Sequence, residues 1–243
     1  MKILVIGESC RDIFNYGVCS RLCPEAPVPV FNPTHSVENG GMAKNVYRNI
    51  LSLDAEANLF TNENWKDITK TRFIDFRSNH MFMRCDANDK QYGRANLKRL
   101  RYKNYDAIVI SDYNKGFLIE EDIEHISGKH PCTFLDTKKV LGEWCKNIKF
   151  IKINNYEYNK TRHTLSREIE DKLIITMGPD GCKYQGIIHP VSEVEIKDAS
   201  GAGDTFISGL SVKYMQTKNI EESIRFANEC ATSVVQKRGV NTV

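Results

Sequence analysis

Five short, nearly continuous apolar segments constrain the fold of this chain more than any other feature. They are residues 2–6, 107–110, 132–135, 149–153 and 172–176. Each has the length of a strand and lacks the alternation of a strand with one solvated face, which is typical of strands buried on both faces of a parallel sheet. Segments with helical spacing lie between several of them, and we expect helices over residues 42–53 and 119–126. The pattern predicts an α/β fold in which helices sandwich a doubly wound, mainly parallel sheet.

Residues 13–38 do not fit this alternation and predict a second, smaller sheet. Pro27 and Pro29 stand at alternate positions of a Val-rich stretch, which excludes a helix and limits ladder hydrogen bonds to one side of a strand. We therefore expect an edge strand here, with partner strands within residues 71–86. The length of 243 residues suits one large domain. The predicted organisation is a single domain over residues 1–243 with a small β-flap, or lid, from about 13–38 and 71–86.

Charge and apolar surface limit the partners that the chain is expected to have. The net charge of +3 is small for this length, so it points neither to nucleic acid nor to membrane. The densest basic run, residues 98–103, is interpreted as a helix and turn with a solvated face. The predicted flap has exposed apolar residues and unpaired strand edges, which proteins usually cover. Pairing of two flaps would cover both the apolar residues and the edges. We therefore expect a homodimer in which the flap acts both as a clasp between the two chains and as a lid.

The sequence contains no recognisable targeting signal. Its first seven residues form an apolar run too short and too soon broken for a signal peptide. No apolar stretch approaches the roughly 18 residues that cross a bilayer. A cytoplasmic location is the default expectation.

Residues 198–206, Asp-Ala-Ser-Gly-Ala-Gly-Asp-Thr-Phe, are the most informative for chemistry. Gly201 and Gly203 flank Ala202 directly before an apolar helical run, so backbone N–H groups would face outward at a helix N-terminus and bind an anion. Asp204 would repel phosphate there unless it faced an attacking hydroxyl group. This arrangement fits phosphoryl transfer, with Asp204 as base and the N–H groups of residues 201–204 as anion site. The alternative is that Asp204 only caps the helix, and this segment alone does not decide between the two.

The same segment resembles the C-terminal signature of the PfkB, or ribokinase-like, family of carbohydrate kinases. Residues 40–46, Gly-Gly-Met-Ala-Lys-Asn-Val, resemble the N-terminal signature that lines the sugar site. Residues 154–157, Asn-Asn-Tyr-Glu, resemble the family's Asn-x-x-Glu motif, and residues 176–181 its nucleotide-binding Thr-x-Gly-x-x-Gly. The likeness spans nearly the whole chain. It implies a ribokinase-like fold and an enzyme that moves the γ-phosphoryl group of ATP to a sugar hydroxyl with Mg²⁺, and it leaves a requirement for a monovalent cation open.

Further segments are similar to one branch, the D-glycero-D-manno-heptose-7-phosphate kinases that form half of a bifunctional heptose enzyme. These segments are residues 20–30, 111–116, 136–138 and 195–198. The similarity implies a heptose 7-phosphate as acceptor. Two alternatives remain: a kinase of another sugar or of a nucleoside, or a non-catalytic regulator that binds sugar or nucleotide. The chain is shorter than usual for the family after Leu53, where residues 60–70 replace a longer strand–helix–strand passage.

The resemblance also implies a set of binding residues around the base and its anion site. The expected substrate-binding residues are Asp12, Gly40, Gly41, Asn45, Arg84, Lys115 and Lys138. The expected ATP-binding residues are Asn154, Glu157, Thr176, Gly178, Gly181, Asp198 and Asn228. Glu157 is also expected to hold Mg²⁺ through a water molecule, since Mg²⁺ usually keeps several waters. Several have a purely structural alternative: Asp12 as a turn cap, Asn45 as a polar helix position, Lys115 at the surface, Glu157 as a solvated helix-start carboxylate and Asn228 packed between helices.

Overall fold

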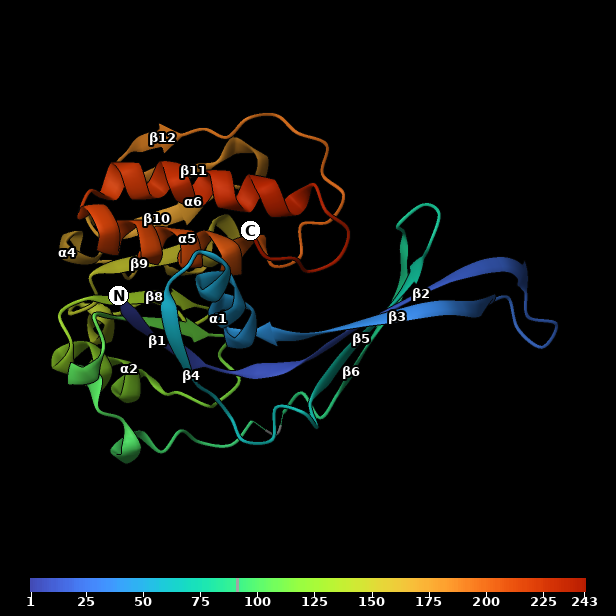
Figure 1. The fold of residues 1–243 in the computed structure, drawn as a ribbon, viewed down its shortest axis with the longest axis horizontal. Helices are drawn as coiled ribbons and strands as arrows, with labels where there is room; N and C mark the ends of the chain where they lie inside the picture. The colour runs from blue at the N-terminus through green and yellow to red at the C-terminus, as the bar shows by residue number, and fades with distance from the viewer. Residues whose placement is uncertain (91) are drawn as a thin grey trace.

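The computed structural model describes residues 1–90 and 92–243, and its body is built on an eight-stranded sheet (Figure 1). The strands are β1 (Lys2–Gly7), β4 (Glu56–Phe60), β7 (Ala107–Asp112), β8 (Thr133–Thr137), β9 (Phe150–Asn154), β10 (Leu173–Thr176), β11 (Cys182–Tyr184) and β12 (Ile187–His189). Their order is β12-β11-β10-β9-β8-β7-β1-β4. All pairings from β4 to β10 are parallel, and β11 and β12 add an antiparallel edge. The five apolar segments form β1, β7, β8, β9 and β10, so the prediction of a mainly parallel sheet is confirmed.

Helices cover both faces of this sheet. One face carries α1 (Ala43–Ser52), α5 (Ala202–Thr217) and α6 (Ile220–Val235). The other carries α2 (Glu120–Lys129), α3 (Asn155–Thr161), α4 (Arg167–Glu170) and the 3₁₀ turns η1 (Leu97–Arg99), η2 (Tyr102–Asn104) and η3 (Glu143–Cys145). The basic run at residues 98–103 therefore forms two 3₁₀ turns and not the predicted helix, although its charged side chains are exposed as expected.

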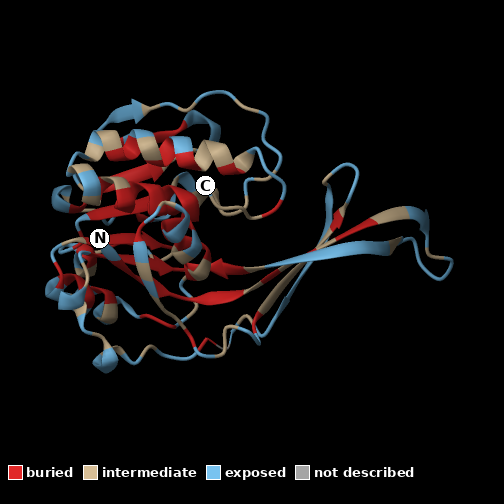
Figure 2. Ribbon diagram, viewed as in Figure 1, coloured by how far each residue is buried: buried red, intermediate tan, exposed pale blue. Residues whose placement is uncertain are grey.

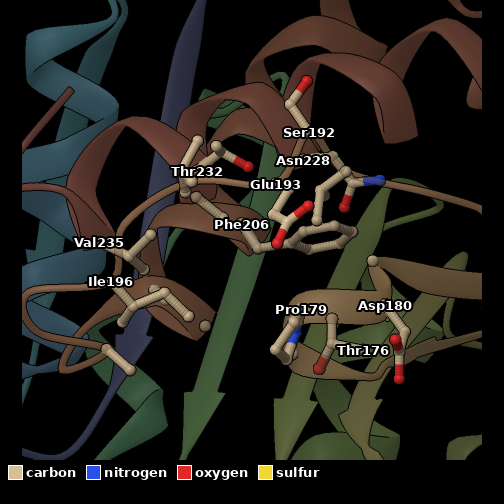
Figure 3. Close-up of a pocket in the computed structure, with 18 residues that line it drawn as sticks. Thr176, Pro179, Asp180, Ser192, Glu193, Ile196, Phe206, Asn228, Thr232 and Val235 are labelled. Carbon is tan, nitrogen blue, oxygen red and sulfur yellow. The ribbon is translucent and has the colours of Figure 1, made fainter.

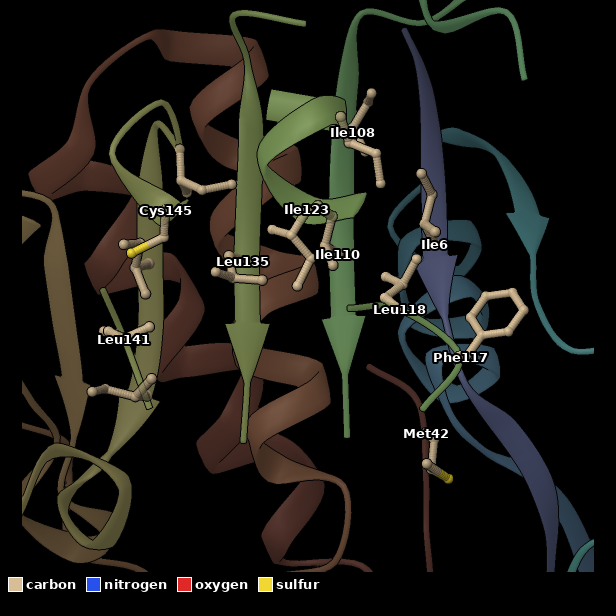
Figure 4. Packing of buried hydrophobic residues seen from close by; sticks show 14 of the residues in the cluster. Ile6, Met42, Ile108, Ile110, Phe117, Leu118, Ile123, Leu135, Leu141 and Cys145 are labelled. Atoms are coloured by element: carbon tan, nitrogen blue, oxygen red, sulfur yellow. The ribbon is translucent and has the colours of Figure 1, made fainter. Parts of the chain in front are cut away.

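Two apolar cores follow from the alternation of side chains along the buried strands. Ile3 and Val5 of β1 face α1 and α5, whereas Leu4 and Ile6 face α2. Figure 4 shows the second core, where Ile123 of α2 lies over the sheet. Burying a side chain of this size contributes about 1.5–3 kcal/mol. The central strands β1, β7 and β8 are accordingly buried along almost their whole length (Figure 2).

A separate four-stranded sheet extends from the body and forms the lid (Figure 1). Its order is β3-β2-β5-β6, with β2 (Ser9–Leu22), β3 (Pro29–Met42), β5 (Thr69–Asp75) and β6 (Met81–Ala87). The Pro-rich stretch forms the hairpin tip and the start of β3, which is an edge strand as the prolines predict. Phe14, Tyr16 and Ile74 form a small core on the face where Val240 of the body packs.

The lid is joined to the body at its root and at the β5–β6 turn. Lys70 of β5 and Lys115 of the body both form ion pairs with Asp89, at 2.6 and 2.5 Å. Near the turn, Arg238 Nη1 donates to the carbonyl of Phe76 at 2.9 Å. These contacts hold the lid beside the carboxyl ends of the parallel strands, where α/β proteins bind ligands. Within the described residues, no helix is both long enough and apolar enough to cross a membrane.

Candidate active site

Asp204 lies in the first turn of α5, and its carboxylate points away from that helix. The Oδ2 atom accepts a hydrogen bond from Asn45 of α1 at 3.0 Å, and Oδ1 accepts one from the Tyr113 hydroxyl at 2.8 Å. Residue Gly201 is the N-cap and no side chain caps the helix, so the capping alternative for Asp204 is wrong. Burial raises the pKa of Asp204 to about 6, while the bond from Asn45 opposes this shift. The carboxylate is thus a weak base that ionises near neutral pH.

The N-terminus of α5, next to this carboxylate, has the backbone geometry of an anion site. Gly201 has a φ of 84°, in the left-handed region that glycine adopts without strain, and this turns the chain into the helix. Ala202 donates its N–H to the carbonyl of Ala199 at 3.3 Å. The N–H groups of Gly203 and Asp204 belong to the first turn, where a helix has no internal acceptors for them. Of the segment predicted as anion hole, these two N–H groups are therefore the better placed to bind phosphate.

A buried cluster of opposite charges lies beside the anion site. Lys152 of β9 forms an ion pair with Asp136 of β8 at 2.8 Å. A Cβ atom on Gly203 would come within 2.8 Å of the Lys152 ammonium, so this cation lies against the first turn of α5. Lys138 contacts Glu157 at 2.5 Å and Asp136 at 3.5 Å. Both lysines are thereby held beside Asp136, and Lys152 also lies against the first turn of α5.

Glu157 is almost fully buried, so the alternative of a solvated carboxylate is wrong. Besides the contact with Lys138, its carboxylate accepts hydrogen bonds from the backbone N–H and the side-chain amide of Asn154, at 2.8 and 3.0 Å. Asn154 in turn caps α3 by accepting from the Glu157 N–H at 2.9 Å. The Asn-x-x-Glu motif is therefore a reciprocal capping box whose acidic residue also reaches the charge cluster. Lys138 was predicted to bind the acceptor, but the structure places it on the Asn154 and Glu157 side.

A cavity of about 510 Å³ opens on the other side of Gly203, between α5, α6 and the strand β10 (Figure 3). Thr176, Gly178, Gly181 and Asn228, all predicted to bind ATP, line it. Its walls are mostly apolar, and Phe206, Ile196 and Val235 face the space in Figure 3. The size and the apolar lining suit a flat heterocycle with a polar tail. Asn228 donates to the carbonyl of His189 at 3.0 Å, which ties α6 to the cavity's far wall.

Asp198, the remaining residue predicted to bind ATP, does not line this cavity. Its carboxylate accepts hydrogen bonds from the N–H groups of Ser200 and Gly239, at 2.8 and 3.2 Å. It thereby fixes the loop that leads into Gly201 against the C-terminal segment. The structure gives Asp198 a role in shaping the anion site.

The residues predicted to bind the acceptor fall into two groups. Asn45 contacts Asp204 directly, as described above. Asp12 forms an ion pair with Arg72 of the lid, and a Cβ on Gly41 would lie 2.6 Å from the Asp12 carboxylate, so the glycine is needed for this close approach. The space that a Cβ atom on Gly40 would need is similarly occupied, by the side chain of Lys44. The absence of a Cβ atom at both positions thus leaves room for the Asp12 and Lys44 side chains at the junction of lid and body.

The second group lies at the lid root. Lys115 pairs with Asp89, and Arg84 forms a bidentate ion pair with Asp86 at 2.8 and 2.7 Å. Lys70 contacts both of these aspartates. Burial would raise the pKa of Asp89, but hydrogen bonds from Lys115, Lys70 and Tyr92 outweigh it and hold the pKa at about 2. These three cations of the lid root, like Arg72 beside Arg84, are each already paired with a carboxylate.

Sequence reasoning missed several residues of this site. It assigned no individual role to Tyr113, Asp136, Lys152, Arg72 or Glu8. Lys152 could have been found, because a charged residue in the middle of a strand buried on both faces is rare unless it is paired. Asp136 could have been found as a carboxylate in another apolar strand. Tyr113 could not, because only the fold brings it to Asp204, 91 positions further along the chain.

Comparison with known proteins agrees with this geometry. Residues 135–243 match the pfkB family carbohydrate kinase model. This match covers 109 of the 243 residues, in the C-terminal part of the chain. The bifunctional protein HldE of Helicobacter acinonychis is 29% identical over 294 aligned positions, and HldE of Nitratiruptor sp. is 28% identical over 291. These alignments cover 98 and 99% of the chain but 63% of each relative. The chain therefore spans less than two thirds of the length of these curated relatives.

Solved structures share the fold at low sequence identity. Thermotoga maritima ribokinase superposes with a TM-score of 0.71 at 13% identity, covering 98% of this chain and 94% of the ribokinase. The nucleoside kinase of Methanocaldococcus jannaschii superposes with a TM-score of 0.71 at 15% identity, covering 98% of this chain and 93% of the nucleoside kinase. Arabidopsis thaliana ribokinase, solved with ribose and ATP, superposes with a TM-score of 0.69 at 14% identity, covering 98% of this chain and 93% of that ribokinase. The predicted ribokinase-like fold is confirmed.

Proposed function

We propose that this chain transfers the γ-phosphoryl group of ATP to a hydroxyl group of a heptose 7-phosphate. The observation that carries the proposal is the position of Asp204. Its buried carboxylate adjoins the first turn of α5, whose residues Ala202 and Gly203 line the cavity, and it accepts hydrogen bonds from Asn45 and Tyr113. A base and an anion site at one helix terminus, beside a nucleotide-sized cavity, suit phosphoryl transfer better than ligand binding alone.

In the proposed reaction the acceptor hydroxyl donates its proton to Asp204 as its oxygen attacks the γ-phosphorus of ATP. The bond between the γ-phosphorus and the β,γ-bridging oxygen breaks, and ADP leaves with that electron pair. The N–H groups of Gly203 and Asp204 and the ammonium of Lys152 stabilise the charge on the transferring group. Asp204 then releases the proton to solvent. The raised pKa of Asp204 suits this role, because the base ionises close to the pH at which it must act.

Mg²⁺ fits this site through water molecules. Within the described residues no cluster of three or more His, Cys, Asp or Glu side chains could hold a metal ion by itself. Asp136 and Glu157 offer two carboxylates on either side of Lys138, and Mg²⁺ bound to phosphates needs few protein ligands. When bound, Mg²⁺ would neutralise charge on the ATP phosphates. The role of these two residues would be to orient its waters.

The lid root supports an acceptor that carries its own phosphate. Lys70, Arg84 and Lys115 converge there, and each is held by a carboxylate that an incoming phosphate could replace as partner. A neutral sugar would gain less from three cations so close together. The similarity of the hairpin tip and of residues 111–116 to heptose-7-phosphate kinases favours a heptose among phosphorylated sugars. A cytoplasmic location would suit a kinase that uses ATP.

The lid also supports the proposed homodimer. Phe31, Phe73 and Phe82 form an aromatic cluster, with ring centroids 5.4 and 6.3 Å from Phe31. They lie on strands β3, β5 and β6, and Phe82 is 38% exposed. Phe73 alternates with Ile74, which faces the body, so this cluster faces away from the body. A second lid would cover the cluster, and the body of its own chain does not.

An acceptor panel with an ADP-release assay tests the proposal. We expect turnover with a heptose 7-phosphate and little or none with ribose, fructose or nucleosides. The Asp204→Asn variant should lose about 100-fold or more in kcat, because the hydroxyl loses its proton acceptor. The control variant Glu121→Gln, on the exposed start of α2, should retain activity. Turnover of ribose or fructose with no turnover of any heptose phosphate would contradict the acceptor, and an unimpaired Asp204→Asn enzyme would contradict the base.

A further inference from the structure

The loop after β7 brings a tyrosine to the proposed base. Tyr113 follows the last residue of β7, and its hydroxyl donates to Asp204 Oδ1 at 2.8 Å. Asn45 occupies the other oxygen at 3.0 Å, so the carboxylate is held at two points from two different elements. Each carboxylate oxygen can accept a further hydrogen bond, which leaves room for an acceptor hydroxyl. The Tyr113 hydroxyl therefore fixes the orientation of Asp204 without blocking it.

A buried glutamate holds the tyrosine in this position. Glu8 follows β1 and is fully buried. One of its carboxylate oxygens accepts from the Tyr113 N–H at 2.9 Å and the other from the Lys115 N–H at 3.0 Å. Its own carbonyl accepts from the N–H of Ala43 at the start of α1. One residue thus links the tyrosine loop to the helix that carries Asn45, and burying a carboxylate for two backbone bonds implies that this loop must be held firmly.

We propose that Tyr113 is a positioning residue for Asp204, which orients the carboxylate toward the acceptor hydroxyl and keeps it ionised by donating a hydrogen bond. The inference rests on the proposed function, because it assumes that Asp204 is the base. Tyr113 does not line the nucleotide cavity, so its effect should fall on the acceptor side and on the chemical step. Desolvation raises the pKa of Tyr113 well above its usual value, so the hydroxyl stays protonated as a donor at any working pH.

Other charged groups also face Asp204 and must be kept constant in a test. Asp136 of β8 raises the pKa of Asp204 and Lys152 of β9 lowers it, and Lys138 also lies within electrostatic range. Replacing Tyr113 by Phe changes none of these three side chains. It removes one oxygen, so a change in the titration of Asp204 can be assigned to the lost hydrogen bond.

The experiment compares the pH dependence of kcat for the wild-type protein and Tyr113→Phe. Loss of a hydrogen bond to the ionised form raises the pKa of a buried carboxylate. The acid limb of the profile should therefore move upward by about one pH unit, the size expected for one hydrogen bond to a charged group. The maximum kcat should fall by about tenfold while KM for ATP stays unchanged. Tyr102→Phe is the matched control, because the Tyr102 hydroxyl is buried and has no hydrogen-bond partner among the described residues.

Incorporation of 3-fluorotyrosine at position 113 provides a test of opposite sign. Fluorine makes the hydroxyl a stronger donor, so the acid limb should move to lower pH, which a merely structural role would not produce. A ¹³C NMR titration of the Asp204 carboxyl group gives the same shifts without turnover. If the wild-type protein phosphorylates no acceptor, the proposed function fails and the NMR titration still tests Tyr113. Coincident titration curves for wild type and Tyr113→Phe would overturn the inference.

Discussion

At the scale of single residues, the proposed base weakens the fold that holds it. Burial raises the pKa of Asp204 from 3.8 to about 6, so the folded protein binds this proton more tightly than the unfolded chain does. The contribution of Asp204 to the free energy of unfolding therefore falls as pH rises from about 4 to about 6. Each pKa unit corresponds to about 1.4 kcal/mol, so an ionised Asp204 costs up to about 3 kcal/mol at pH 8.

The variant Asp204→Asn removes this cost together with the activity. We expect its free energy of unfolding to exceed that of the wild-type protein by about 1–3 kcal/mol at pH 8, since an amide needs no ionisation in a buried site. The difference should shrink as pH falls from about 6 toward 4, because Asp204 becomes protonated in the folded state over this range. Urea unfolding at several pH values measures it. A variant that is less stable at pH 8, or a difference that does not change with pH, would contradict the assignment.

At the scale of elements, α5 contains one glycine beside the proposed anion site, Gly203, and another at a helix–helix contact, Gly209. A Cβ on Gly203 would meet the Lys152 ammonium at 2.8 Å, whereas a Cβ on Gly209 would meet Cys230 Sγ at 3.0 Å and the Ala227 backbone at 3.3 Å. The first neighbour is the end of a flexible side chain, and the second is the packed surface of α6. A side chain at Gly203 would therefore displace Lys152, whereas a side chain at Gly209 would disturb the packing of α5 against α6.

Gly203→Ala should lower kcat by about tenfold or more, because it moves Lys152 out of the anion site. Its stability should change little, since alanine favours a helix over glycine by about 1 kcal/mol. Gly209→Ala should instead lower the free energy of unfolding by about 1–3 kcal/mol through overpacking against α6. Urea unfolding and ADP-release rates on both variants check this. Equal stability losses with unchanged kcat in Gly203→Ala would refute a role for Lys152 at the anion site.

The elements also divide into those that the sequence could predict and those it could not. Strands buried on both faces carry their own signal, so β1, β7, β8, β9 and β10 were predictable from continuous apolar runs. Gly201 and Gly203, at the start of α5, likewise predicted a helix N-terminus with free N–H groups. The partners of the charged residues were not predictable, because contacts such as Lys138 with Glu157 depend on how neighbouring strands align. The hydrogen bond between Tyr113 and Asp204 is of the same kind.

At the scale of the whole molecule, the chain is shorter than the part of its relatives with which it aligns. The alignment with HldE of H. acinonychis runs over 294 positions, more than the 243 residues present, so that relative has residues without a counterpart here. No helix connects β4 to β5, and residues 88–106 contribute only 3₁₀ turns among the described residues. Among the described residues, neither of these two regions lines the nucleotide cavity.

The lid gives the last prediction, which concerns assembly. Light scattering of the wild-type protein at micromolar concentration should give the mass of a dimer, because pairing of two lids buries the cluster of Phe31, Phe73 and Phe82. Phe82→Asp should give a monomer, since a charge in that cluster would be buried without a partner. Ile187→Asp is the control: this residue is 59% exposed on β12, at the far edge of the other sheet, and its variant should remain dimeric. A monomeric wild type, or a dimer that survives Phe82→Asp but not Ile187→Asp, would place the interface elsewhere than on the lid.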